Sequence, residues 1–358
     1  MRIAQLAPLV ESVPPKGYGG TELVVNLLTE ELVKNAHDVT LFATGDSITS
    51  AKLVSIIPEG LRASQDNFRH RWNTYDVRSI LTLKKMQDQF DIIHNHMGFM
   101  ALPFLSEFKT PVVTTNHNNI VPYCQDIYFE YANMPFVAIS QAYKNLNFPD
   151  KMNYAEVVYN GIDLDDYVLP KNLRISRDYL LFIGRISKAK GTADAIDIAI
   201  ELGLPIKVAG KVDATDISYY EEHIKDRLKH PLVDYIGEAT KDQKAQLYAG
   251  AKAVVYPIDF DEPFGLVMAE ALAMGTPVMA YDRGSVCEII KDKEVGIVGN
   301  TKQELIDRYP EIELISEKAC MKRAKENFSK ERMAKHYLDV FQKLVVGSGT
   351  KRIYQFTN

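Results

Sequence analysis

The sequence predicts an α/β protein with two doubly wound domains, each a parallel sheet covered by helices on both faces. Short β-rich runs alternate with helical patterns through most of the chain, which is typical of parallel sheets. The chain has 358 residues, more than a single hydrophobic core usually serves. A polar stretch at 164–174, which contains a proline, interrupts the alternation and is the expected linker. We therefore expect domains at 1–165 and 166–329.

The first domain alternates strands and helices from the start of the chain. Its predicted strands span 2–7, 38–44, 52–57, 91–94, 111–116, 136–139 and 156–159. Its predicted helices span 21–34, 75–89, 98–108 and 141–147. Doubly wound sheets bind ligands at the carboxyl ends of their strands, so residues just after these strands are the site candidates.

The second domain repeats the alternation. Its predicted strands span 179–183, 206–209, 233–236, 253–256, 277–280 and 296–298. Its predicted helices span 192–202, 219–228, 241–249 and 265–273. The tail at 316–346 predicts two more helices, so the chain closes on helix and not on sheet.

Composition describes a globular protein without bulk attraction to nucleic acid. Apolar residues make up 46%, charged residues 25%, and the net charge is -5. Cys124, Cys287 and Cys320 are scattered without CxxC spacing, which indicates neither a disulfide framework nor a zinc site. The amino terminus lacks the apolar core of a signal peptide, and the apolar stretch 265–280 is too short for a membrane span. We expect a cytoplasmic protein.

Two glutamates eight residues apart, Glu262 and Glu270, flank the most informative stretch of the chain. Pro263 is expected in the first turn of a helix, with Glu262 on the loop and Glu270 about two turns inside. Carboxylates accept hydrogen bonds from hydroxyls, and the positive end of a helix suits a phosphate. Three backbone amides would lie exposed at that end: those of Phe264, Gly265 and Leu266. A nucleotide sugar offers both partners, although an ordinary capped helix with solvated acids fits the spacing equally well.

A glycine-rich loop at 14–22 follows the first strand and leads into a helix. Its amides could cradle an anion, with Gly19, Gly20 and Thr21 as the contacts. The spacing matches neither the GxGxxG dinucleotide fingerprint nor the GxxxxGK[ST] phosphate loop, which disfavours oxidoreductases and kinases. A surface loop with a turn is the structural alternative.

Three histidines lie near strand ends. His117 follows the strand at 111–116 and could orient a substrate hydroxyl or lie near the reacting carbon, although a lone histidine is more often structural. His94 and His96 would share one face of their strand. Because no third ligand has suitable spacing, a hydrogen-bonded structural role is favoured over zinc binding.

Cations follow the strand that opens the second domain. Gly184, Arg185 and Lys190 lie just past this buried strand. The departure of a nucleoside diphosphate develops negative charge, which a fixed arginine and lysine would stabilise. We select Arg185 and Lys190 for that role and expect Lys188 to be a solvated charge.

Taken together, these motifs resemble the family-4 retaining glycosyltransferases of the two-domain GT-B fold. The resemblance covers nearly the whole chain in family order: Tyr18–Glu22, Asp38–Phe42, Asp91–His94, Thr114–His117, Val137–Ser140, Asn160–Asp163, Gly184–Arg185 with Lys190–Gly191, Glu262–Glu270 and Gly275–Val278. Two motifs depart from the family. Ala36 replaces the glycine of Gly-His-Asp, a change expected to alter only a turn. Residues 283–288 replace the usual Gly-Gly-x-Pro-Glu, with Glu288 retaining the acid.

The resemblance implies a role for each matching position. Glu270 would hold the ribose hydroxyls of the donor, and Glu262 those of the transferred sugar. Arg185 and Lys190 would bind the diphosphate, and His117 would contact the sugar near the reacting carbon. The implied catalytic residues are His117, Arg185, Lys190 and Glu262. The implied donor-binding residues are Gly19, Gly20, Thr21, Gly184, Phe264, Gly265, Leu266, Val267 and Glu270.

The implied reaction moves a sugar from a nucleoside diphosphate donor to an acceptor hydroxyl, with retention at the anomeric carbon. A UDP-sugar is the first choice of donor and a GDP-sugar the second; the acceptor would be a carbohydrate, a lipid-linked molecule or a small molecule. The resemblance implies no metal and no cofactor, and a terminal helix at about 330–350 that returns to the first domain. A nucleotide-sugar epimerase or phosphorylase of this fold, and a non-catalytic carbohydrate-binding protein, stay open.

Residues 61–72 mix cations with aromatics in the domain that holds the acceptor in this family. This stretch could touch a lipid-linked acceptor or a membrane surface. A solvated loop over a core aromatic is the alternative. Peripheral contact with a membrane therefore stays open.

Overall fold

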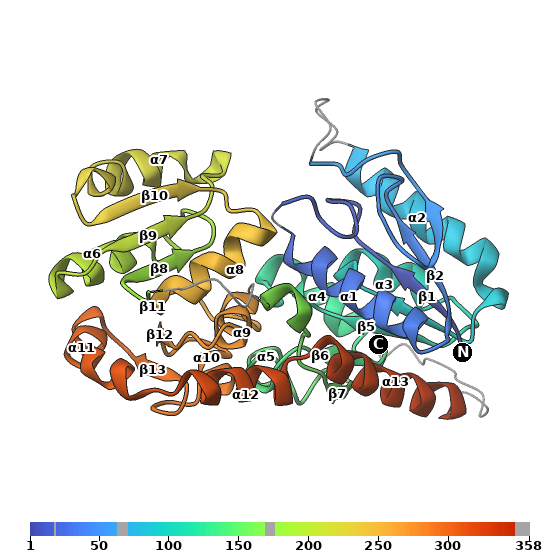
Figure 1. Ribbon diagram of the computed structural model, residues 1–358. Helices are drawn as coiled ribbons and strands as arrows, with labels where there is room; N and C mark the ends of the chain where they lie inside the picture. The colour runs from blue at the N-terminus through green and yellow to red at the C-terminus, as the bar shows by residue number, and fades with distance from the viewer. Residues whose placement is uncertain (18, 63–70, 169–175, 348–358) are drawn as a thin grey trace. The chain divides into compact units, whose positions relative to one another are not determined.

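The computed structural model describes residues 1–17, 19–62, 71–168 and 176–347, and the chain forms two compact units (Figure 1). One unit comprises Met1–Gly161 and Lys330–Asn358, and the other comprises Ile162–Ser329. Each unit is built on a parallel sheet of its own, with seven strands in the first and six in the second. The predicted fold class is confirmed. Most of the predicted linker lies outside the described residues.

The sheet of the first unit has the order β3-β2-β1-β4-β5-β6-β7, and every pairing is parallel. Its strands are β1 (Arg2–Leu6), β2 (Asp38–Ala43), β3 (Lys52–Ser55), β4 (Ile92–Asn95), β5 (Val112–Thr115), β6 (Phe136–Ala138) and β7 (Tyr154–Val157). The strand order reverses between β1 and β4. Doubly wound sheets bind ligands at such a switch point.

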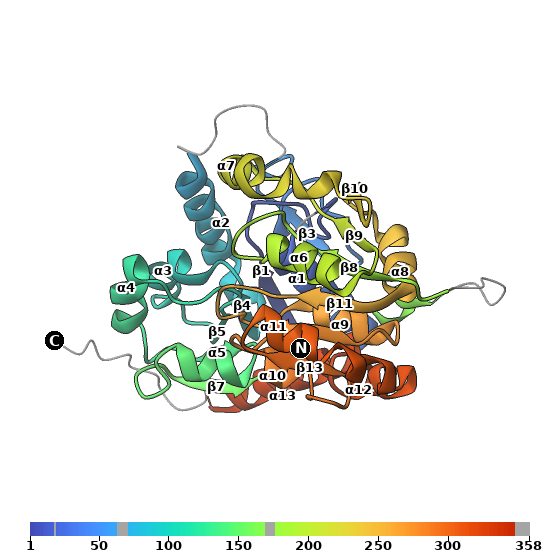
Figure 2. The ribbon, with the colours of Figure 1, turned by 90° about the vertical axis from the view of Figure 1, so that its left-hand side faces the viewer.

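Helices cover both faces of this sheet. They are α1 (Gly20–Lys34), α2 (Trp72–Met86), α3 (Leu102–Leu105), α4 (Gln125–Glu130), α5 (Gln141–Leu146) and α13 (Lys330–Gly347), with short 3-10 turns at Gln87–Gln89, Gly98–Ala101 and Pro122–Cys124. Successive residues of a strand point to opposite faces. Phe42 joins the core cluster that contains Ile80 of α2, whereas its neighbour Leu41 joins the cluster that contains Val25 of α1. Figure 2 shows α2, α3 and α4 gathered on one side of the unit.

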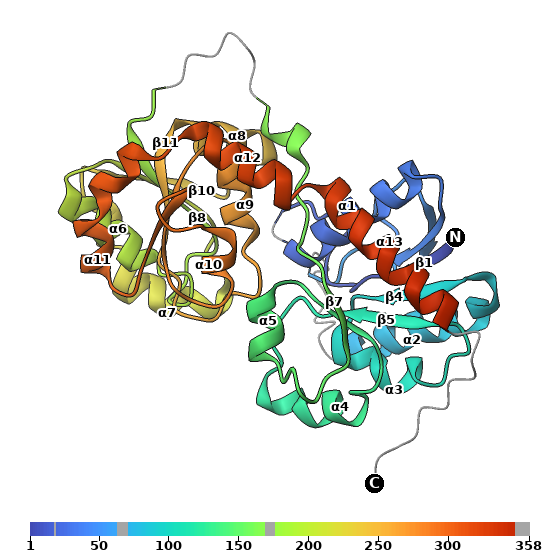
Figure 3. The same cartoon turned by 90° about the horizontal axis from the view of Figure 1, so that it is seen from below.

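The C-terminal helix α13 belongs to the first unit and lies alongside α1 (Figure 3). Its apolar side is buried at Met333, Tyr337 and Phe341. The hydroxyl of Tyr337 lies 3.0 Å from Thr115 Oγ1 at the end of β5. Lys330 Nζ lies 3.7 Å from the buried carboxylate of Glu31 in α1. The helix is therefore held by both its apolar stripe and polar contacts.

The sheet of the second unit has the order β10-β9-β8-β11-β12-β13, again with parallel pairings. Its strands are β8 (Tyr179–Ile183), β9 (Ile206–Ala209), β10 (Val233–Gly237), β11 (Ala251–Tyr256), β12 (Val278–Tyr281) and β13 (Gly296–Gly299). Here the order reverses between β8 and β11, which places this unit's switch point beside the loops that follow those two strands.

The helices of the second unit are α6 (Thr192–Leu202), α7 (Ile217–Tyr219), α8 (Lys241–Gly250), α9 (Leu266–Ala273), α10 (Val286–Ile289), α11 (Lys302–Asp307) and α12 (Glu317–Asn327). Short 3-10 segments lie at Leu164–Tyr167, Ala214–Asp216, Arg227–Lys229 and Tyr309–Leu314, and a π-turn lies at Tyr220–Ile224. The predicted helices at 98–108 and 219–228 are therefore each broken into short turns. The helices α4, α10 and α11 were not predicted, because four to six residues are too few to show a helical period.

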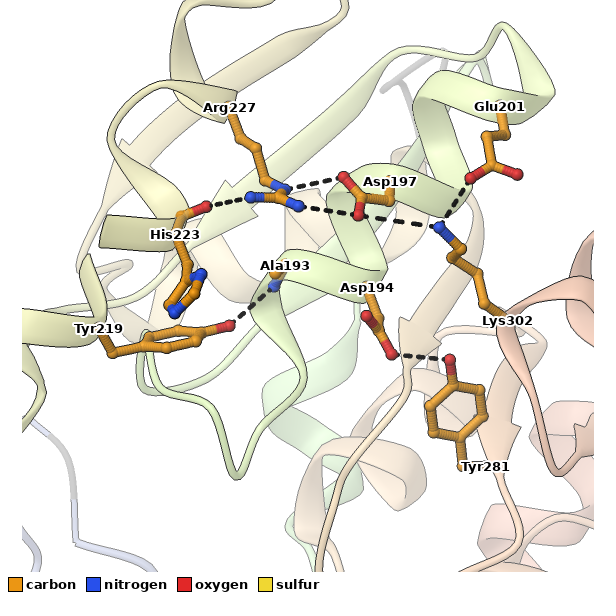
Figure 4. A network of polar contacts seen from close by, with 9 residues as sticks. All are labelled: Ala193, Asp194, Asp197, Glu201, Tyr219, His223, Arg227, Tyr281 and Lys302. Atoms are coloured by element: carbon orange, nitrogen blue, oxygen red, sulfur yellow. Dashed lines mark hydrogen bonds and ion pairs between the residues drawn. The ribbon is translucent and has the colours of Figure 1, made fainter. Parts of the chain in front are cut away.

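A polar network holds α6 in place next to the loop that carries Arg185 and Lys190 (Figure 4). Arg227 donates to both carboxylate oxygens of Asp197 at 2.8 and 3.1 Å. Lys302 of α11 lies 2.7 Å from Glu201, and Tyr281 of β12 donates to Asp194 at 2.8 Å. Bidentate arginine–carboxylate pairs fix orientation better than single ion pairs do. The start of α6 is thus fixed relative to the sheet.

The departure from the family at Ala36 falls in a left-handed turn after α1. Ala36 has a φ of 60°, the region that favours glycine. The backbone N–H of Ala36 donates to Val33 and that of His37 to Leu32, the paired hydrogen bonds of a Schellman motif. The alanine therefore adopts a conformation that favours glycine, at a cost in backbone strain.

Candidate functional site

The predicted site residues form two sets, one in each unit, and every member follows a strand near a switch point. In the first unit Gly19 and Gly20 follow β1, and His117 follows β5. In the second unit Arg185 follows β8 and Glu262 follows β11. Each set is described by itself.

Lys190 and Glu262, predicted separately for the diphosphate and the sugar, are in direct contact in the second unit. Lys190 Nζ lies 3.0 Å from Glu262 Oε2. Tyr256, the last residue of β11, accepts from Lys190 at 3.2 Å and donates to the same carboxylate oxygen at 2.5 Å. The ammonium also lies over the ring of Phe260, 4.6 Å from its centroid. Both charged side chains are mostly buried and mutually neutralised.

The loop that carries Glu262 is held from behind by the segment that departs from the family pattern. The backbone N–H of Ser285 donates to Glu262 O at 2.9 Å, and Ser285 Oγ donates to Phe264 O at 2.8 Å. Gly284 has a φ of 57°, and a Cβ there would lie 2.4 Å from Glu262 O. The glycine and the serine thus let this segment lie directly against the Glu262 loop.

The start of helix α9 corrects one prediction. The helix begins at Leu266, after Gly265 in the left-handed conformation with a φ of 84°, so Pro263 lies on the loop and not in the first turn. A left-handed glycine, not a proline, sets the helix start. Among the described residues, no side chain caps this helix, so its first amides, at Leu266 and Val267, are available to an anion.

Glu270 is the fifth residue of α9, little more than one turn inside, which also corrects the predicted two turns. Its buried carboxylate accepts a hydrogen bond from Tyr248 at 2.7 Å. Tyr167 also lies beside Glu270, and burial next to this carboxylate raises the pKa of both tyrosines well above the usual range. Lys244 Nζ lies 3.9 Å from Glu270 Oε2. The carboxylate is therefore held in one orientation.

Arg185 is half-buried and paired with acids that the sequence did not single out. Its guanidinium lies 3.6 Å from Asp213 and 3.5 Å from Asp216. Within the described part of the chain Arg185 Nε has no hydrogen-bond partner, because these contacts are longer than a hydrogen bond. Gly184 precedes it with a φ of 153°. Lys188 is exposed, as predicted.

The glycine loop of the first unit leads into α1. Gly19 is the N-cap residue with extended backbone, and a Cβ there would lie 2.7 Å from the side chain of Pro15. Gly20 is exposed at the first position of the helix, and Thr21 is half-buried. Glu22 is buried in the first turn, where desolvation raises the pKa of its carboxyl. Tyr18 lies outside the described residues.

His117 ends a chain of hydrogen bonds in the first unit. His117 Nε2 lies 2.9 Å from His96 Nδ1, and His96 Nε2 lies 2.8 Å from Gln5 Oε1. Desolvation lowers the pKa of His117 to about 4 and the pKa of His96 and His94 well below the usual range. All three imidazoles are therefore neutral at pH 7. His94 and His96 lie together, with ring centroids 3.9 Å apart.

Neutral buried histidines make the first unit sensitive to acid. Above about pH 6.5 the imidazoles are neutral in both the folded and the unfolded chain. Below this pH the unfolded chain binds protons and the folded unit does not, so the free energy of unfolding decreases as the pH is lowered. We expect His117→Asn to flatten this fall by about 1.4 kcal/mol per pH unit between about pH 6.5 and about pH 4. Urea unfolding followed by Trp72 fluorescence measures it, because the chain has 1 tryptophan and it lies in this unit.

The pH dependence of the parent chain must be compared with that of His117→Asn, because other groups in this unit also titrate. Burial raises the pKa of Asp76 to about 6, so Asp76 adds stability as the pH is lowered, opposite to the histidines. His223→Asn, at an exposed position of the other unit, is the matched control. Equal pH slopes for His117→Asn and the parent chain would contradict the burial of a neutral His117.

Three further expectations concern a metal site, a membrane span and the stretch at 61–72. The described residues hold no cluster of three or more His, Cys, Asp or Glu side chains arranged to bind a metal ion. Throughout 1–17, 19–62, 71–168 and 176–347, every helix is too short or too polar to span a lipid bilayer. Most of the stretch at 61–72, considered for acceptor or membrane contact, lies outside the described residues.

Sequence reasoning missed the side chains that hold the candidate residues in place. These are Gln5, His96 in its contact with His117, Tyr167, Asp213, Asp216, Tyr248, Tyr256 and Ser285. Tyr256 ends a predicted strand, so the rule that selected His117 could have found it. Tyr248 lies inside a helix and Tyr167 in the linker region, where no local pattern marks them.

The two parallel-sheet units have the architecture of the GT-B fold, and two glycosyltransferase family models match the chain. The family model described as Glycosyltransferase Family 4 matches residues 18–166, and the model described as Glycosyl transferases group 1 matches residues 170–329. The chain belongs to this glycosyltransferase family, as its motifs predicted.

Curated relatives and solved structures agree. An uncharacterized glycosyltransferase of Methanocaldococcus jannaschii is 25% identical over 82% of this chain and 84% of its own length. A phosphatidyl-myo-inositol mannosyltransferase of Mycobacterium tuberculosis is 24% identical over 83% of this chain and 82% of its own.

Among solved structures, a glycosyltransferase involved in avilamycin A biosynthesis aligns with a TM-score of 0.74 at 23% identity, covering 97% of this chain and 99% of that one. An Anabaena protein crystallised with UDP and glucose aligns with a TM-score of 0.73 at 18% identity, covering 96% and 100%. These likenesses show the fold.

Proposed function

We propose that this glycosyltransferase moves a hexose from a nucleoside diphosphate sugar to an acceptor hydroxyl, with retention at the anomeric carbon and without a metal. The observation that carries the proposal is the contact between Lys190, in the loop before α6, and Glu262, in the loop before α9. It joins a cation suited to phosphate with an acceptor suited to hydroxyls, beside a helix start that offers free amides. A nucleotide sugar presents both kinds of group on adjacent atoms.

Charge on the leaving diphosphate would be stabilised by three sources. The Lys190 ammonium has three N–H donors, so it can donate one more hydrogen bond beyond those to Glu262 and Tyr256. Arg185 would exchange its long contacts with Asp213 and Asp216 for shorter ones to phosphate oxygens. The amides of Leu266 and Val267 add the positive end of α9. Fixed cations and amides can therefore do the work of a metal ion here, and we assign no protein nucleophile.

The two glutamates would accept hydrogen bonds from hydroxyls on either side of the diphosphate. The hydrogen bonds that Glu262 makes to Lys190 and Tyr256 fall on Oε2, so we assign Oε1 to the sugar hydroxyls. Glu270, held by the hydrogen bond from Tyr248, would accept from the ribose. Hydrogen bonds to a charged acceptor contribute about 1.5–3 kcal/mol each. This difference in position separates recognition of the nucleotide from recognition of the sugar.

Donor and acceptor classes follow from the comparisons as proposals. A UDP-sugar is placed first because a structural neighbour was crystallised with UDP-glucose, and a GDP-sugar second. The acceptor is a carbohydrate, a lipid-linked molecule or a small molecule; relatives named for such substrates include a phosphatidyl-myo-inositol mannosyltransferase and a D-inositol 3-phosphate glycosyltransferase. We also propose a cytoplasmic location, consistent with three scattered cysteines, and leave membrane contact to a liposome assay.

The proposal is tested by incubating the full chain with a panel of UDP- and GDP-sugars, with and without acceptors, in the presence of a metal chelator. We expect nucleoside diphosphate release that depends on an acceptor, and NMR of the product should show the donor's anomeric configuration. Conversion of the donor without any acceptor would favour an epimerase. Nucleotide binding with no release under any condition would favour a carbohydrate-binding protein.

A further inference from the structure

We propose that Gln5 and His96 are positioning residues that fix the tautomer of His117, so that His117 Nδ1 is a hydrogen-bond acceptor for a ligand hydroxyl. The identity of that ligand, the donor sugar, rests on the function proposed above. The tautomer itself follows from the hydrogen bonds of this unit and can be tested without any substrate.

Neighbouring strands at the switch point bring the three side chains together. Gln5 lies in β1 and His96 directly follows β4, its neighbour in the sheet. The backbone N–H of His96 donates to Leu6 O at 3.0 Å, which extends the pairing of β4 with β1 and fixes the start of the next loop. His117 lies one residue further along its loop, past Asn116, after β5. The Gln5 and His96 side chains are buried, whereas His117 is half-buried.

The direction of each hydrogen bond follows from the chemistry of its partner. An amide oxygen only accepts, so His96 Nε2, 2.8 Å from Gln5 Oε1, must carry the proton. A neutral imidazole has a single N–H, so His96 Nδ1 is left as an acceptor. His117 Nε2, 2.9 Å away, must then donate to it. His117 Nδ1 consequently carries a lone pair.

Burial keeps this arrangement from being lost to protonation. Desolvation lowers the pKa of His117 to about 4, and desolvation and the neighbouring imidazoles of His94 and His117 lower the pKa of His96 well below its usual range. Both rings are therefore neutral at pH 7, as the chain of donors and acceptors requires. Protonating His96 would place its Nδ1–H against the N–H of His117, and protonating His117 would remove the lone pair on Nδ1.

A second observation sets Gln5 apart from a packing residue. Its amide nitrogen is buried without a hydrogen-bond partner in the described part of the chain. A buried donor left without a partner costs about 1–3 kcal/mol. An apolar residue of similar size would avoid that cost, so the amide oxygen of Gln5 must contribute something that packing does not. Orienting the proton of His96 is the contribution that its geometry supports.

A neighbouring branch provides a matched control. His94 Nε2 lies 2.8 Å from Thr115 Oγ1, which lies 3.0 Å from Tyr337 OH on α13. This branch is also buried, and the His94 ring lies 3.9 Å from the His96 ring, tilted by 49°, but the branch makes no hydrogen bond to His117 in the described residues. Thr115→Val should therefore perturb the same core without moving the proton on His117.

The tautomer has a consequence for specificity. A lone pair on His117 Nδ1 binds a hydroxyl but not a carbonyl, an ether oxygen or a fluorine, which offer no proton. A donor sugar whose contacted hydroxyl is removed or replaced by fluorine should lose this bond. Sites built around a substrate hydroxyl discriminate strongly against analogues that lack it, because the site's own polar group is left unpaired.

The direct test is ¹⁵N NMR of the full chain with labelled histidine, with His117 assigned by comparison with His117→Asn. We expect His117 Nδ1 to resonate as an unprotonated, pyridine-type nitrogen and Nε2 as a protonated, pyrrole-type nitrogen. Gln5→Glu keeps an acceptor at the same place and should keep that pattern. Gln5→Met removes the acceptor and should mix the two tautomers, whereas Thr115→Val should change nothing.

Protonated Nδ1 in the parent chain would overturn the proposal, since it would mean that the Gln5 amide is turned and donates to His96. An unchanged pattern in Gln5→Met would also overturn it. If Gln5→Met does not fold, the parent spectrum and the Gln5→Glu spectrum still decide. For the active enzyme, kcat/KM should fall roughly 10–100-fold in Gln5→Met, as is typical when a supporting hydrogen-bond partner is lost, and recover in Gln5→Glu.

The two levels of the proposal fail separately. Absence of transferase activity with every donor would refute the proposed function and leave the NMR result standing. Full activity in Gln5→Met, together with a changed tautomer, would refute the role of Nδ1 in binding the sugar.

Discussion

Replacing Lys190 by methionine should lower kcat by about 10²–10³-fold, the loss typical of removing one fixed group that stabilises charge in a transition state. Methionine keeps the length of the side chain and its contact with the ring of Phe260. The measurement is steady-state release of nucleoside diphosphate from the best donor and acceptor. Lys188→Met is the matched control, because Lys188 is an exposed lysine of the same loop.

Loss of the Lys190 ammonium should also affect Glu262, its ion-pair partner. Without the ammonium, Tyr256 is the one side-chain donor left to Glu262 among the described residues, and Glu262 faces the diphosphate with an uncompensated negative charge. Glu262→Gln alone should also lower kcat, and the double variant should lose much less than the product of the two single losses. Independent losses that simply multiply would contradict a shared site. Unchanged kcat in Lys190→Met would remove Lys190 from the reaction.

Gly191→Ala should destabilise the second unit severely, by about 4 kcal/mol or more, because two costs coincide at this position. Gly191 is the N-cap of α6 with a φ of 70°, where a side chain is strained. A Cβ there would also lie 1.8 Å from Pro257 O, a backbone atom that cannot move aside without shifting the loop that leads to Glu262. Hydrogen–deuterium exchange of β8 and α6 measures the loss of stability.

Gly203 supplies the control for this prediction at the other end of the same helix. It is the C-cap of α6 with a φ of 67°, and a Cβ there would have nothing within 4 Å among the described residues. Gly203→Ala should therefore cost only the backbone strain, about 1–2 kcal/mol. Similar protection of β8 and α6 from hydrogen–deuterium exchange in Gly191→Ala and Gly203→Ala would contradict the prediction, because it would show that the backbone at Pro257 can move aside.

The sheets could be predicted from the sequence because their signal is local. Buried parallel strands are short apolar runs between turns, and the strands of both units lie where such runs occur, as with Tyr179–Ile183 and Ile206–Ala209. The short helices could not be predicted in the same way. Val286–Ile289, for example, forms a single turn that depends on packing of its neighbours more than on a pattern of its own.

The site was predictable to the extent that strand ends mark it. His117 and Arg185 were selected for their places after strands, and the structure has strands ending before both. Glu262 was selected for its place on the loop before a helix, and α9 follows that loop. What could not be predicted is which side chains meet. The contact between Lys190 and Glu262 joins residues 72 positions apart, and that between His96 and Gln5 joins residues 91 apart. Such pairs are set by sheet order, which no local spacing encodes.

Binding of nucleoside diphosphates to the second unit should be measurable as a gain in stability of the chain. Thermal or chemical unfolding of the parent chain and of Glu270→Ala is followed with UDP, GDP and ADP and their sugars. A ligand at about 100 times its Kd adds about 2.7 kcal/mol of stability. We expect one nucleotide, UDP first, to stabilise the parent chain by this amount and to stabilise Glu270→Ala much less at the same concentration. Equal stabilisation of both proteins, or none of the parent by any nucleotide, would contradict it.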